Sequence, residues 1–335
     1  MTAVDVAEEE RRAWLERRRT GIGGSDVAAV LGLSPWTSRW SLWADKVGLL
    51  ELDEDPSEAM EFGKRAEDML RQWFEDRTGM TVAGVQAEHT DPDRPWMRVT
   101  LDGEVWTFND RLSAAELLGV VEFKATGESP AAWADGPPIQ YQCQASWAMA
   151  ITGARRVWFG VLHIPFGRPT FRTYLYERDE NDIAYVVDAC DRFWHDHVVT
   201  GNPPLADGSR ATTEALADVY YDPTEAAIEA DEEIAGIVAS LRLVSADLKV
   251  LEERETELKN RVRAYLGDAT VLTEGVDPKN RPIVAATWRI QDRVAPGLDQ
   301  AALEHAYPAW TSPDGLRTPR PVRVLLIKSP KKGTP

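Results

Sequence analysis

The 335-residue sequence predicts an α/β fold over its first 205 residues, followed by a long helix and a small β-containing extension. Two runs of apolar and β-branched residues, Val99–Val105 and Leu117–Lys124, have the composition of neighbouring strands. Helical 3.6-residue patterns precede and follow them, as expected when helices flank a central mixed sheet. A third pattern, apolar residues at alternating spacings of three and four, runs from Ile234 to Tyr265 and predicts a coiled-coil-like helix.

The first segment with a clear local pattern is the glycine-rich stretch Arg19–Gly32. Ser25 is predicted to cap a short helix, Asp26 would complement the helix dipole, and Gly32 would end it. Glycines before a helix N-terminus leave backbone N–H groups free, which suits an anion such as phosphate. The alternative is a flexible turn and a capped helix that bind nothing.

A long amphipathic helix is predicted over Glu58–Thr78, with Gly79 as its stop. Glu67 lies beside its apolar face and could be either a rim carboxylate or a group that reaches into a site on the sheet. The residues expected to face inward are Phe62, Ala66, Met69, Leu70, Trp73 and Phe74.

The two predicted strands bring acidic groups together. Side chains two apart on a strand share a face, so Glu122 and Lys124 should project together while Phe123 turns into the core. Asp102, on the preceding strand, would supply a second carboxylate. An Asp and a Glu on adjacent strands can bind a hard divalent cation, and a nearby lysine can position or deprotonate a water. The pattern therefore predicts a metal-dependent nuclease site, against the alternative of an exposed ion pair on a strand face.

The chain contains two further triplets of the same kind. Glu257-Leu258-Lys259 lies in the strongly helical stretch, where residues two apart point in different directions. Asp277-Pro278-Lys279 lies in a turn-like segment. Only the Glu122 triplet combines a strand with a partner aspartate.

After the strand pair, a helix is predicted over Gln140–Gly153, followed by a strand at Arg156–His163 and a helix at Asp182–Val199. Gln142 and Gln144 are two apart on the first helix, so at most one of them should point at a site.

The C-terminal third is predicted to be organised differently. Residues 206–223 are turn-rich and are predicted as a linker, 224–267 as the coiled-coil-like helix, and 268–335 as a small extension with strand-like runs and a basic tail. The apolar seam of the helix could pair with another chain, pack on the first domain, or form one arm of a hairpin. Its members are Ile234, Ile237, Leu241, Val244, Leu248, Leu251, Leu258, Val262 and Tyr265, interrupted at Glu255.

Composition sets limits on function. The start of the chain lacks an apolar segment typical of a signal peptide, no run of about 20 apolar residues occurs, and two cysteines do not form a disulfide framework. A soluble cytoplasmic protein without membrane association is therefore expected. The net charge of −17 disfavours nucleic acid as a partner, so a DNA-binding role requires a local basic track, for which the arginines between Arg11 and Arg19 are candidates.

Five motifs in this order resemble the YqaJ-like viral recombinase family, relatives of the phage lambda exonuclease among the PD-(D/E)XK nucleases. They are the glycine-rich loop, the Phe-Gly-Lys helix, the Leu-Asp-Gly strand, the Glu-x-Lys strand and the glutamine-containing helix. In this sequence the matching stretches are Arg19–Gly32, Phe62–Glu67, Leu101–Gly103, Glu122–Lys124 and Tyr141–Gly153. Two departures occur: Leu101 stands where the superfamily name has proline, and Ser146 replaces a glutamine that often continues the Gln-x-Gln pattern.

The resemblance implies a role for each matching residue. Asp102 and Glu122 would bind one or two Mg²⁺ ions, which Mn²⁺ could replace, with help from the Phe123 backbone carbonyl. Lys124 would orient or activate the attacking water. Glu67 would be a further acidic group at the metal cluster, and Gln144 would support Lys124 and the substrate phosphate. Arg19 and Ser25 would hold a terminal 5′-phosphate.

The resemblance further implies a Mg²⁺-dependent 5′→3′ exonuclease that acts on double-stranded DNA ends in the cytoplasm of a bacterial host and produces 3′ overhangs for phage-type recombination. A single-strand annealing protein and a homo-oligomer, such as a ring-shaped trimer, would be its partners. Two alternatives stay open at this point. One is an endonuclease or branched-DNA resolvase with the same site, and the other is a non-catalytic oligomeric protein that binds DNA ends.

Overall fold

The computed structural model describes residues 3–52, 58–109, 114–222, 227–291 and 322–327. The chain divides into two compact units, Met1–Thr224 and Glu225–Pro335, and each is described by itself.

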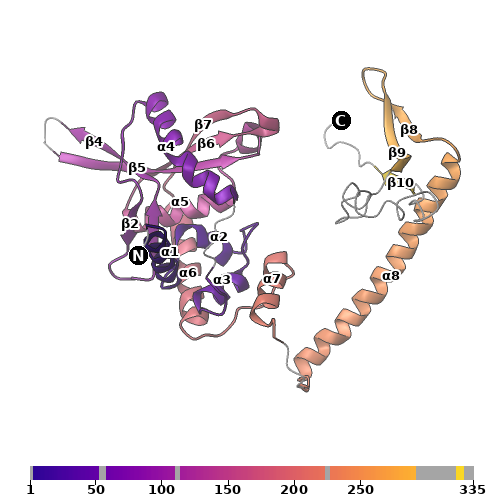
Figure 1. Cartoon of the computed structure of the whole chain (residues 1–335), viewed down its shortest axis with the longest axis horizontal. Coiled ribbons are helices and arrows are strands. Elements are labelled where there is room, and N and C mark those ends of the chain that lie inside the picture. Colours follow the sequence, from indigo (N-terminus) through magenta and orange to yellow (C-terminus); the bar gives the residue numbers. More distant parts are fainter. Residues whose placement is uncertain (1–2, 53–57, 110–113, 223–226, 292–321, 328–335) are drawn as a thin grey trace. The chain divides into compact units, whose positions relative to one another are not determined.

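A five-stranded mixed sheet forms the centre of the N-terminal unit (Figure 1). The strand order is β1-β4-β5-β6-β7; β5 and β6 run parallel, and the other neighbours are antiparallel. The strands are β1 (Val82–Ala83), β4 (Gly103–Asn109), β5 (Ala114–Thr126), β6 (Arg156–His163) and β7 (Thr170–Glu177). The predicted mixed α/β core is therefore confirmed, including the strand over Leu117–Lys124 and its neighbour β6.

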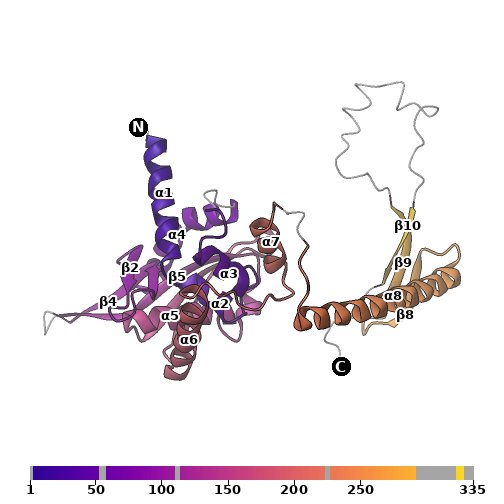
Figure 2. The ribbon, with the colours of Figure 1, turned by 90° about the horizontal axis from the view of Figure 1, so that it is seen from below.

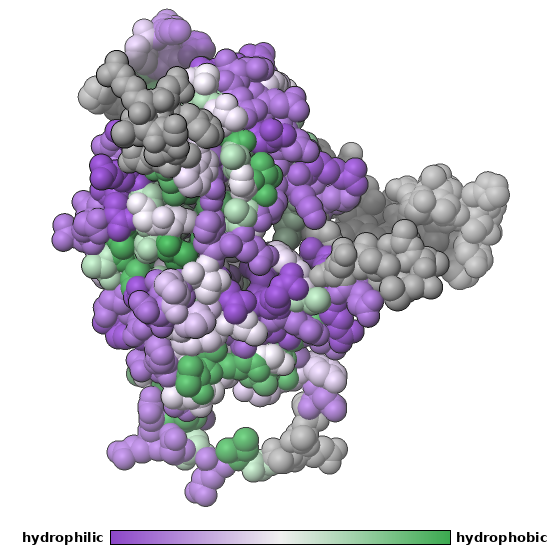
Figure 3. All heavy atoms as spheres, turned by 90° about the vertical axis from the view of Figure 1, so that its left-hand side faces the viewer, coloured by the Kyte–Doolittle hydropathy of each residue, from purple (hydrophilic) through white to green (hydrophobic). Residues whose placement is uncertain are grey.

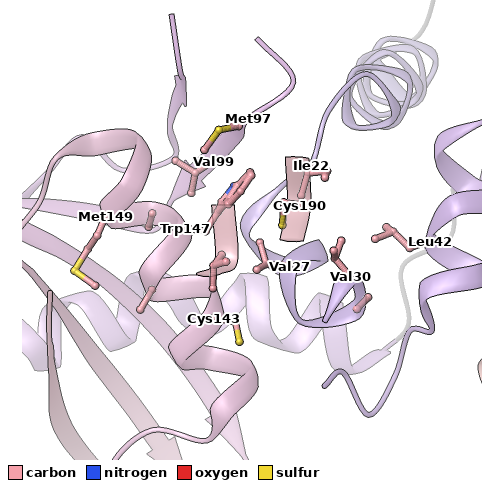
Figure 4. Packing of buried hydrophobic residues seen from close by; sticks show 14 of the residues in the cluster. Ile22, Val27, Val30, Leu42, Met97, Val99, Cys143, Trp147, Met149 and Cys190 are labelled. Carbon is pink, nitrogen blue, oxygen red and sulfur yellow. The ribbon is translucent and has the colours of Figure 1, made fainter. Parts of the chain in front are cut away.

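Helices cover both faces of this sheet. Alternate side chains of β5 point to opposite faces, so each face has its own cluster of buried apolar residues. Val121 and Phe123 pack against α4 (Glu58–Thr78), whereas Val120 lies in the larger cluster beneath α5 (Ile139–Thr152) and α6 (Glu180–Phe193). Figure 4 shows this larger core, where α5 meets the N-terminal segments. The buried residues of α2 (Val27–Val30) and α3 (Arg39–Lys46) belong to this core, and α1 (Ala3–Arg19) precedes them in the sequence.

The chain bends at Asp102, and this bend places the residue at the end of a strand pairing. The run predicted as one strand is divided into β3 (Arg98–Leu101), which pairs with β2 (Ala87–Thr90), and β4, which starts at Gly103. Asp102 lies between them, so its side chain projects beyond the point where the β4–β5 pairing begins.

Several local predictions differ from the structure. On α4, Ala66, Leu70 and Phe74 are buried, but Phe62 and Met69 are exposed, because the sheet covers a narrower stripe than the sequence pattern indicates. Ser25 does not cap a helix. Gly23 occupies the cap position of a short 3₁₀ turn, Gly24–Asp26, without a side-chain hydrogen bond.

The segment predicted as a linker also differs. It contains helix α7 (Arg210–Val219), which belongs to the N-terminal unit. The Thr212 hydroxyl donates to Ser38 Oγ, 2.7 Å away, and Ser38 caps α3. A hydroxyl pair with little access to solvent therefore joins α7 to α3.

The C-terminal unit consists of one long helix and a small sheet (Figures 1 and 2). The predicted helix over 224–267 is observed as α8 (Glu232–Leu266). Three antiparallel strands follow in the order β10-β9-β8, namely β8 (Val271–Val276), β9 (Pro282–Gln291) and β10 (Val322–Ile327). The sequence pattern predicted strands at Pro282–Ile290 and Val322–Lys328, which correspond to β9 and β10, but it did not predict β8. The predicted basic tail, Ser329–Pro335, lies outside the described residues.

Surface character agrees with the charged composition. The face drawn in Figure 3 is largely hydrophilic, and apolar residues form smaller patches between the hydrophilic ones. Within the described ranges, no helix combines the length and the apolar character needed to cross a membrane.

Candidate active site

Glu122 and Lys124 lie side by side on β5, as their spacing predicts. Lys124 Nζ donates to Glu122 Oε2 at 2.9 Å. The Glu122 side chain is only 1% exposed, so this pair is not the exposed strand-face ion pair considered above. A carboxylate is costly to bury, and it is retained in proteins where it is paired or binds a metal.

Asp102 reaches the same position from the end of the neighbouring strand. Its Oδ2 accepts the backbone N–H of Phe123 at 2.7 Å. Within a strand, the N–H and C=O of one residue point to the same side, so the Phe123 carbonyl is directed toward Asp102 as well. The pairing of β4 with β5 begins at Gly103 and Val121. Phe123 therefore lies past the paired part of β5 and faces the bend at Asp102 instead.

Gln144 on α5 completes the surroundings of Glu122. Its Nε2 donates to Glu122 Oε2 at 2.8 Å, whereas the Gln142 amide donates to the carbonyl of Pro137. Of the two glutamines only Gln144 therefore contacts Glu122, in agreement with their spacing of two on a helix. The other carboxylate oxygen, Glu122 Oε1, is buried and has no hydrogen-bond partner among the described residues.

Burial and charge act together on the pKa values here. Burial raises the pKa of Glu122 to about 7; the Lys124 ammonium opposes this rise, and the Asp102 carboxylate adds to it. Burial alone would lower the pKa of Lys124, but the Glu122 and Asp102 carboxylates raise it above the ordinary value. The lysine therefore remains an ammonium at neutral pH.

Glu67 approaches the site from α4. Burial, and then the Asp102 charge, raise the pKa of Glu67 to about 7. Its Oε2 accepts a hydrogen bond from Gln86 Nε2 at 3.0 Å. Of the two sequence interpretations, a carboxylate near the site fits better than a remote rim position.

These residues fit a hard divalent cation. The site offers carboxylates, a backbone carbonyl and the unpartnered Glu122 Oε1, all oxygen donors of the kind that Mg²⁺ prefers. Within the described residues, no three His, Cys, Asp or Glu side chains form a ready cluster for a metal ion. Mg²⁺ does not require one, because it usually binds through one or two carboxylates and completes its shell with waters and substrate phosphates.

A basic cavity of about 240 Å³ lies next to this site. Gln144 belongs to its lining as well as to the Glu122 pair, so the two sites share a wall. The cavity lining includes the three arginines Arg17, Arg18 and Arg98, together with Ser25 and His89 and two carboxylates, those of Asp26 and Glu88.

The arginine beside Ser25 is Arg18. Arg18 Nη2 lies 3.4 Å from Ser25 Oγ and 3.4 Å from Asp26 Oδ1. Arg19 instead donates to Asp45 Oδ1 at 2.9 Å and to the Leu50 carbonyl at 2.6 Å. The structure thus brings Ser25 to the cavity but not Arg19. Arg18, which the sequence placed only in a general basic track, takes the position expected for Arg19, and Arg98 is a candidate anion-binding residue that the sequence interpretation missed. Arg17-Arg18-Arg19 is a continuous run, and sequence spacing could not tell which member points inward.

A buried ion pair holds this arginine segment in place. Lys46 Nζ lies 2.7 Å from Asp26 Oδ2 and donates to the Arg18 carbonyl at 2.8 Å. Burial would raise the pKa of Asp26, but the Lys46 ammonium and then Arg18 lower it below its usual value. Asp26 Oδ2 also accepts the Gly23 N–H at 2.9 Å, so one carboxylate links the glycine-rich loop, α1 and α3.

Close packing explains one glycine in this loop. A Cβ atom at Gly21 would lie 2.6 Å from the Trp96 carbonyl oxygen. The loop therefore lies directly against the segment that leads into β3, and this contact sets the position of the cavity wall.

With this geometry established, sequence comparison places the chain among known proteins. The family model described as the YqaJ-like viral recombinase domain matches residues 13–155. The chain is 30% identical over 268 residues to the uncharacterized protein YqaJ of Bacillus subtilis (strain 168), covering 78% of this chain and 80% of that protein. The chain belongs to the YqaJ family.

Other similarities of this YqaJ-family protein are more limited. Protein D345L of African swine fever virus (strain Badajoz 1971 Vero-adapted) is 43% identical over 47 residues, 14% of each chain. Among solved structures, an alkaline exonuclease from Laribacter hongkongensis has 20% identity in its complex with dAMP, with a TM-score of 0.41 over 63% of this chain and 95% of that one. A phage-related exonuclease from Haemophilus somnus 129PT has 10% identity and a TM-score of 0.35 over 54% of this chain and 96% of that one.

Proposed function

We propose that this YqaJ-family protein is a Mg²⁺-dependent nuclease that degrades double-stranded DNA from its ends in the 5′→3′ direction. The observation that carries the proposal is the buried Glu122 carboxylate. It is paired with Lys124, touched by Gln144, adjacent to Asp102, and left with one unpartnered oxygen. A structural ion pair would not leave a buried oxygen unsatisfied without cost.

Each residue of the site has its own proposed role. Asp102, Glu122 and the Phe123 carbonyl would hold one or two Mg²⁺ ions, with Glu67 as a further carboxylate nearby. The bound Mg²⁺ would polarise the scissile phosphate and offset its developing charge, and Mn²⁺ would be able to substitute. The Lys124 ammonium would orient the attacking water and add positive charge beside the phosphate. The Gln144 amide would keep Glu122 in place and donate to the phosphate.

The basic cavity supports a preference for DNA ends. It lies against the proposed metal site and presents Arg17, Arg18, Arg98 and Ser25. A terminal 5′-phosphate bound there would place the first phosphodiester near Glu122, with Arg18 in the role first assigned to Arg19. The same cavity supplies local positive charge in a chain whose net charge is −17.

The family description points to recombination as the process that such an activity would serve. A 5′→3′ exonuclease leaves 3′ single strands, which a single-strand annealing protein would bind. We expect a homo-oligomer, with a ring-shaped trimer as the arrangement to test.

Cleavage of defined DNA substrates tests the proposal. Linear duplexes with 5′-phosphate or 5′-hydroxyl ends, branched DNA and covalently closed circles are incubated with the protein in Mg²⁺ or in EDTA. We expect stepwise loss of 5′-phosphorylated strands in Mg²⁺ alone. Cutting of circles or branched DNA would favour an endonuclease or resolvase.

A variant pair separates catalysis from mere end binding. Lys124→Ala should abolish cleavage, whereas Lys279→Ala, in the turn triplet, should leave it unchanged. If Mg²⁺ supports no cleavage and Lys124→Ala behaves like the wild type, the protein is a non-catalytic DNA-end binder.

A further inference from the structure

Helix α8 presents an apolar stripe to solvent along most of its length. It has 35 residues, which corresponds to about 50 Å at 1.5 Å per residue. In Figures 1 and 2 it is a continuous rod with the small sheet beside its C-terminal end. Within the described residues, its side-chain packing against that sheet is at this end, where Leu266 and Val262 contact a cluster around Ala286.

The exposed stripe follows a heptad pattern over more than four repeats, enough for a coiled coil. Leu248, near its middle, is 53% exposed. The positions conventionally called a are Ile234, Leu241, Leu248, Glu255 and Val262; the d positions are Ile237, Val244, Leu251, Leu258 and Tyr265. A stripe of this length is costly to leave in water and is typical of a helix that pairs with another.

We propose that α8 pairs with α8 of a second copy of this chain, in antiparallel orientation. The register that overlaps the whole helix places Leu248 opposite Leu251 of the second copy and Leu241 opposite Leu258. The inference uses only the C-terminal unit and does not depend on the proposed nuclease activity.

A parallel pair is disfavoured by the charges along the seam. In a parallel pair Glu255 would face Glu255 of the second copy in the apolar core, and two like charges there are costly. At the flanks, Asp247 would face Glu252, and Arg254 would face Lys259. Each of these flanking contacts joins like charges and occurs twice in a symmetric pair.

The antiparallel pair removes each of these conflicts. Glu255 then faces Val244 of the second copy, beside which its carboxylate can extend to solvent. Asp247 lies next to Arg254 of the second copy, and symmetry repeats this favourable contact. Charge complementarity, which mainly sets orientation and partner choice, therefore selects a second copy in reverse direction.

Molecular mass in solution tests the pairing. The full-length wild type and two variants are compared by sedimentation equilibrium, with circular dichroism as the check on helix content. Leu248→Glu places a charge in the seam, whereas Val250→Glu places the same charge on another face of α8, at a residue that is 64% exposed. We expect Leu248→Glu to have half the mass of the wild type and Val250→Glu to keep the wild-type mass. Equal masses for all three proteins would overturn the proposal. Equal masses are also the result expected if another part of the same chain covers the stripe.

The orientation is tested with a spin label at Ser240→Cys. In the proposed register, residue 240 lies opposite residue 259 of the second copy, so the two labels are separated by about 28 Å along the axis. A parallel pair would bring the labels within about 15 Å of each other, because neighbouring helix axes are 8–10 Å apart. The native cysteines, Cys143 and Cys190, are buried, so the unsubstituted chain serves as the labelling control. The shorter distance would contradict the antiparallel pair.

Discussion

Two triplets with the same pattern, Glu122-Phe123-Lys124 on β5 and Glu257-Leu258-Lys259 on α8, have different surroundings. On the strand, glutamate and lysine contact each other at 2.9 Å, and the carboxylate is almost completely buried. On the helix, Lys259 instead pairs with Glu255 at 2.7 Å, Glu257 pairs with Arg254, and the Glu257 side chain is 54% exposed. The comparison shows that secondary structure decides whether this spacing brings the glutamate and the lysine together or directs them to different partners.

The largest expected difference between the triplets is in catalysis. Glu122→Gln removes a proposed metal ligand and should lower the single-turnover cleavage rate by at least about 100-fold, similar to the loss of a key electrostatic group in other active sites. Glu257→Gln, the matched change on α8, should leave the rate within about 2-fold, because an exposed charge contributes little. Equal losses of cleavage rate in the two variants would contradict the proposed difference between the two triplets.

Stability in EDTA provides the second comparison. Lys124→Met leaves a buried carboxylate without its cation and should lower the free energy of unfolding by about 3 kcal/mol, as when one partner of a buried pair is removed. Lys259→Met breaks an exposed i, i+4 pair and should change it by less than about 0.5 kcal/mol. Urea unfolding at neutral pH measures both changes in the free energy of unfolding. A large loss of stability in Lys259→Met would contradict the view that the exposed Glu255–Lys259 pair stabilises the fold only weakly.

Neighbouring arginines extend the same comparison to the basic cavity. Arg18→Ala should reduce the preference for 5′-phosphorylated over 5′-hydroxyl ends by about 10-fold, because one charged hydrogen bond to phosphate is lost. Arg19→Ala should keep the preference and instead lower the melting temperature, since Arg19 joins Asp45 and the Leu50 carbonyl. Loss of the preference in Arg19→Ala alone would restore the assignment made from sequence.

The smallest expected effect is a pH dependence from the buried Asp26–Lys46 pair. The pKa of Asp26 in the folded protein lies below its usual value, so its ionised form stabilises the fold above about pH 4. This contribution is lost as pH falls through the lowered pKa. The stability difference between wild type and Asp26→Asn, followed by urea unfolding from pH 7 to pH 3, should therefore decrease below about pH 4. A difference that grows on acidification would contradict the assignment.

Sequence alone predicted the elements whose signals are local. A run of apolar and β-branched residues predicted β5, the strand at Arg156–His163 was predicted where β6 is found, and Gly153, with φ of 73°, ends α5 where its position indicated. The catalytic-type triplet on β5 could be recognised because the period of a strand places its two ends on one face.

Features that depend on tertiary packing could not be predicted in this way. Phe62 and Met69 fit the apolar pattern of α4, yet the width of the sheet leaves them exposed. The choice of Arg18 over Arg19 depends on how α1 meets α3 through Lys46 and Asp26. Helix α7 lies in a turn-rich region, and its contact with α3 comes from residues far apart in sequence.

Divalent cation binding tests most directly whether the β5 triplet, and not its α8 counterpart, forms the active site. Mn²⁺ titration of the metal-free protein, followed by electron paramagnetic resonance, is compared for wild type, Asp102→Asn, Glu122→Gln and Glu257→Gln. The expected result is that the wild type and Glu257→Gln bind one or two ions, while Asp102→Asn and Glu122→Gln bind at least about 10-fold more weakly. Equal Mn²⁺ binding by all four proteins would contradict the proposed metal site.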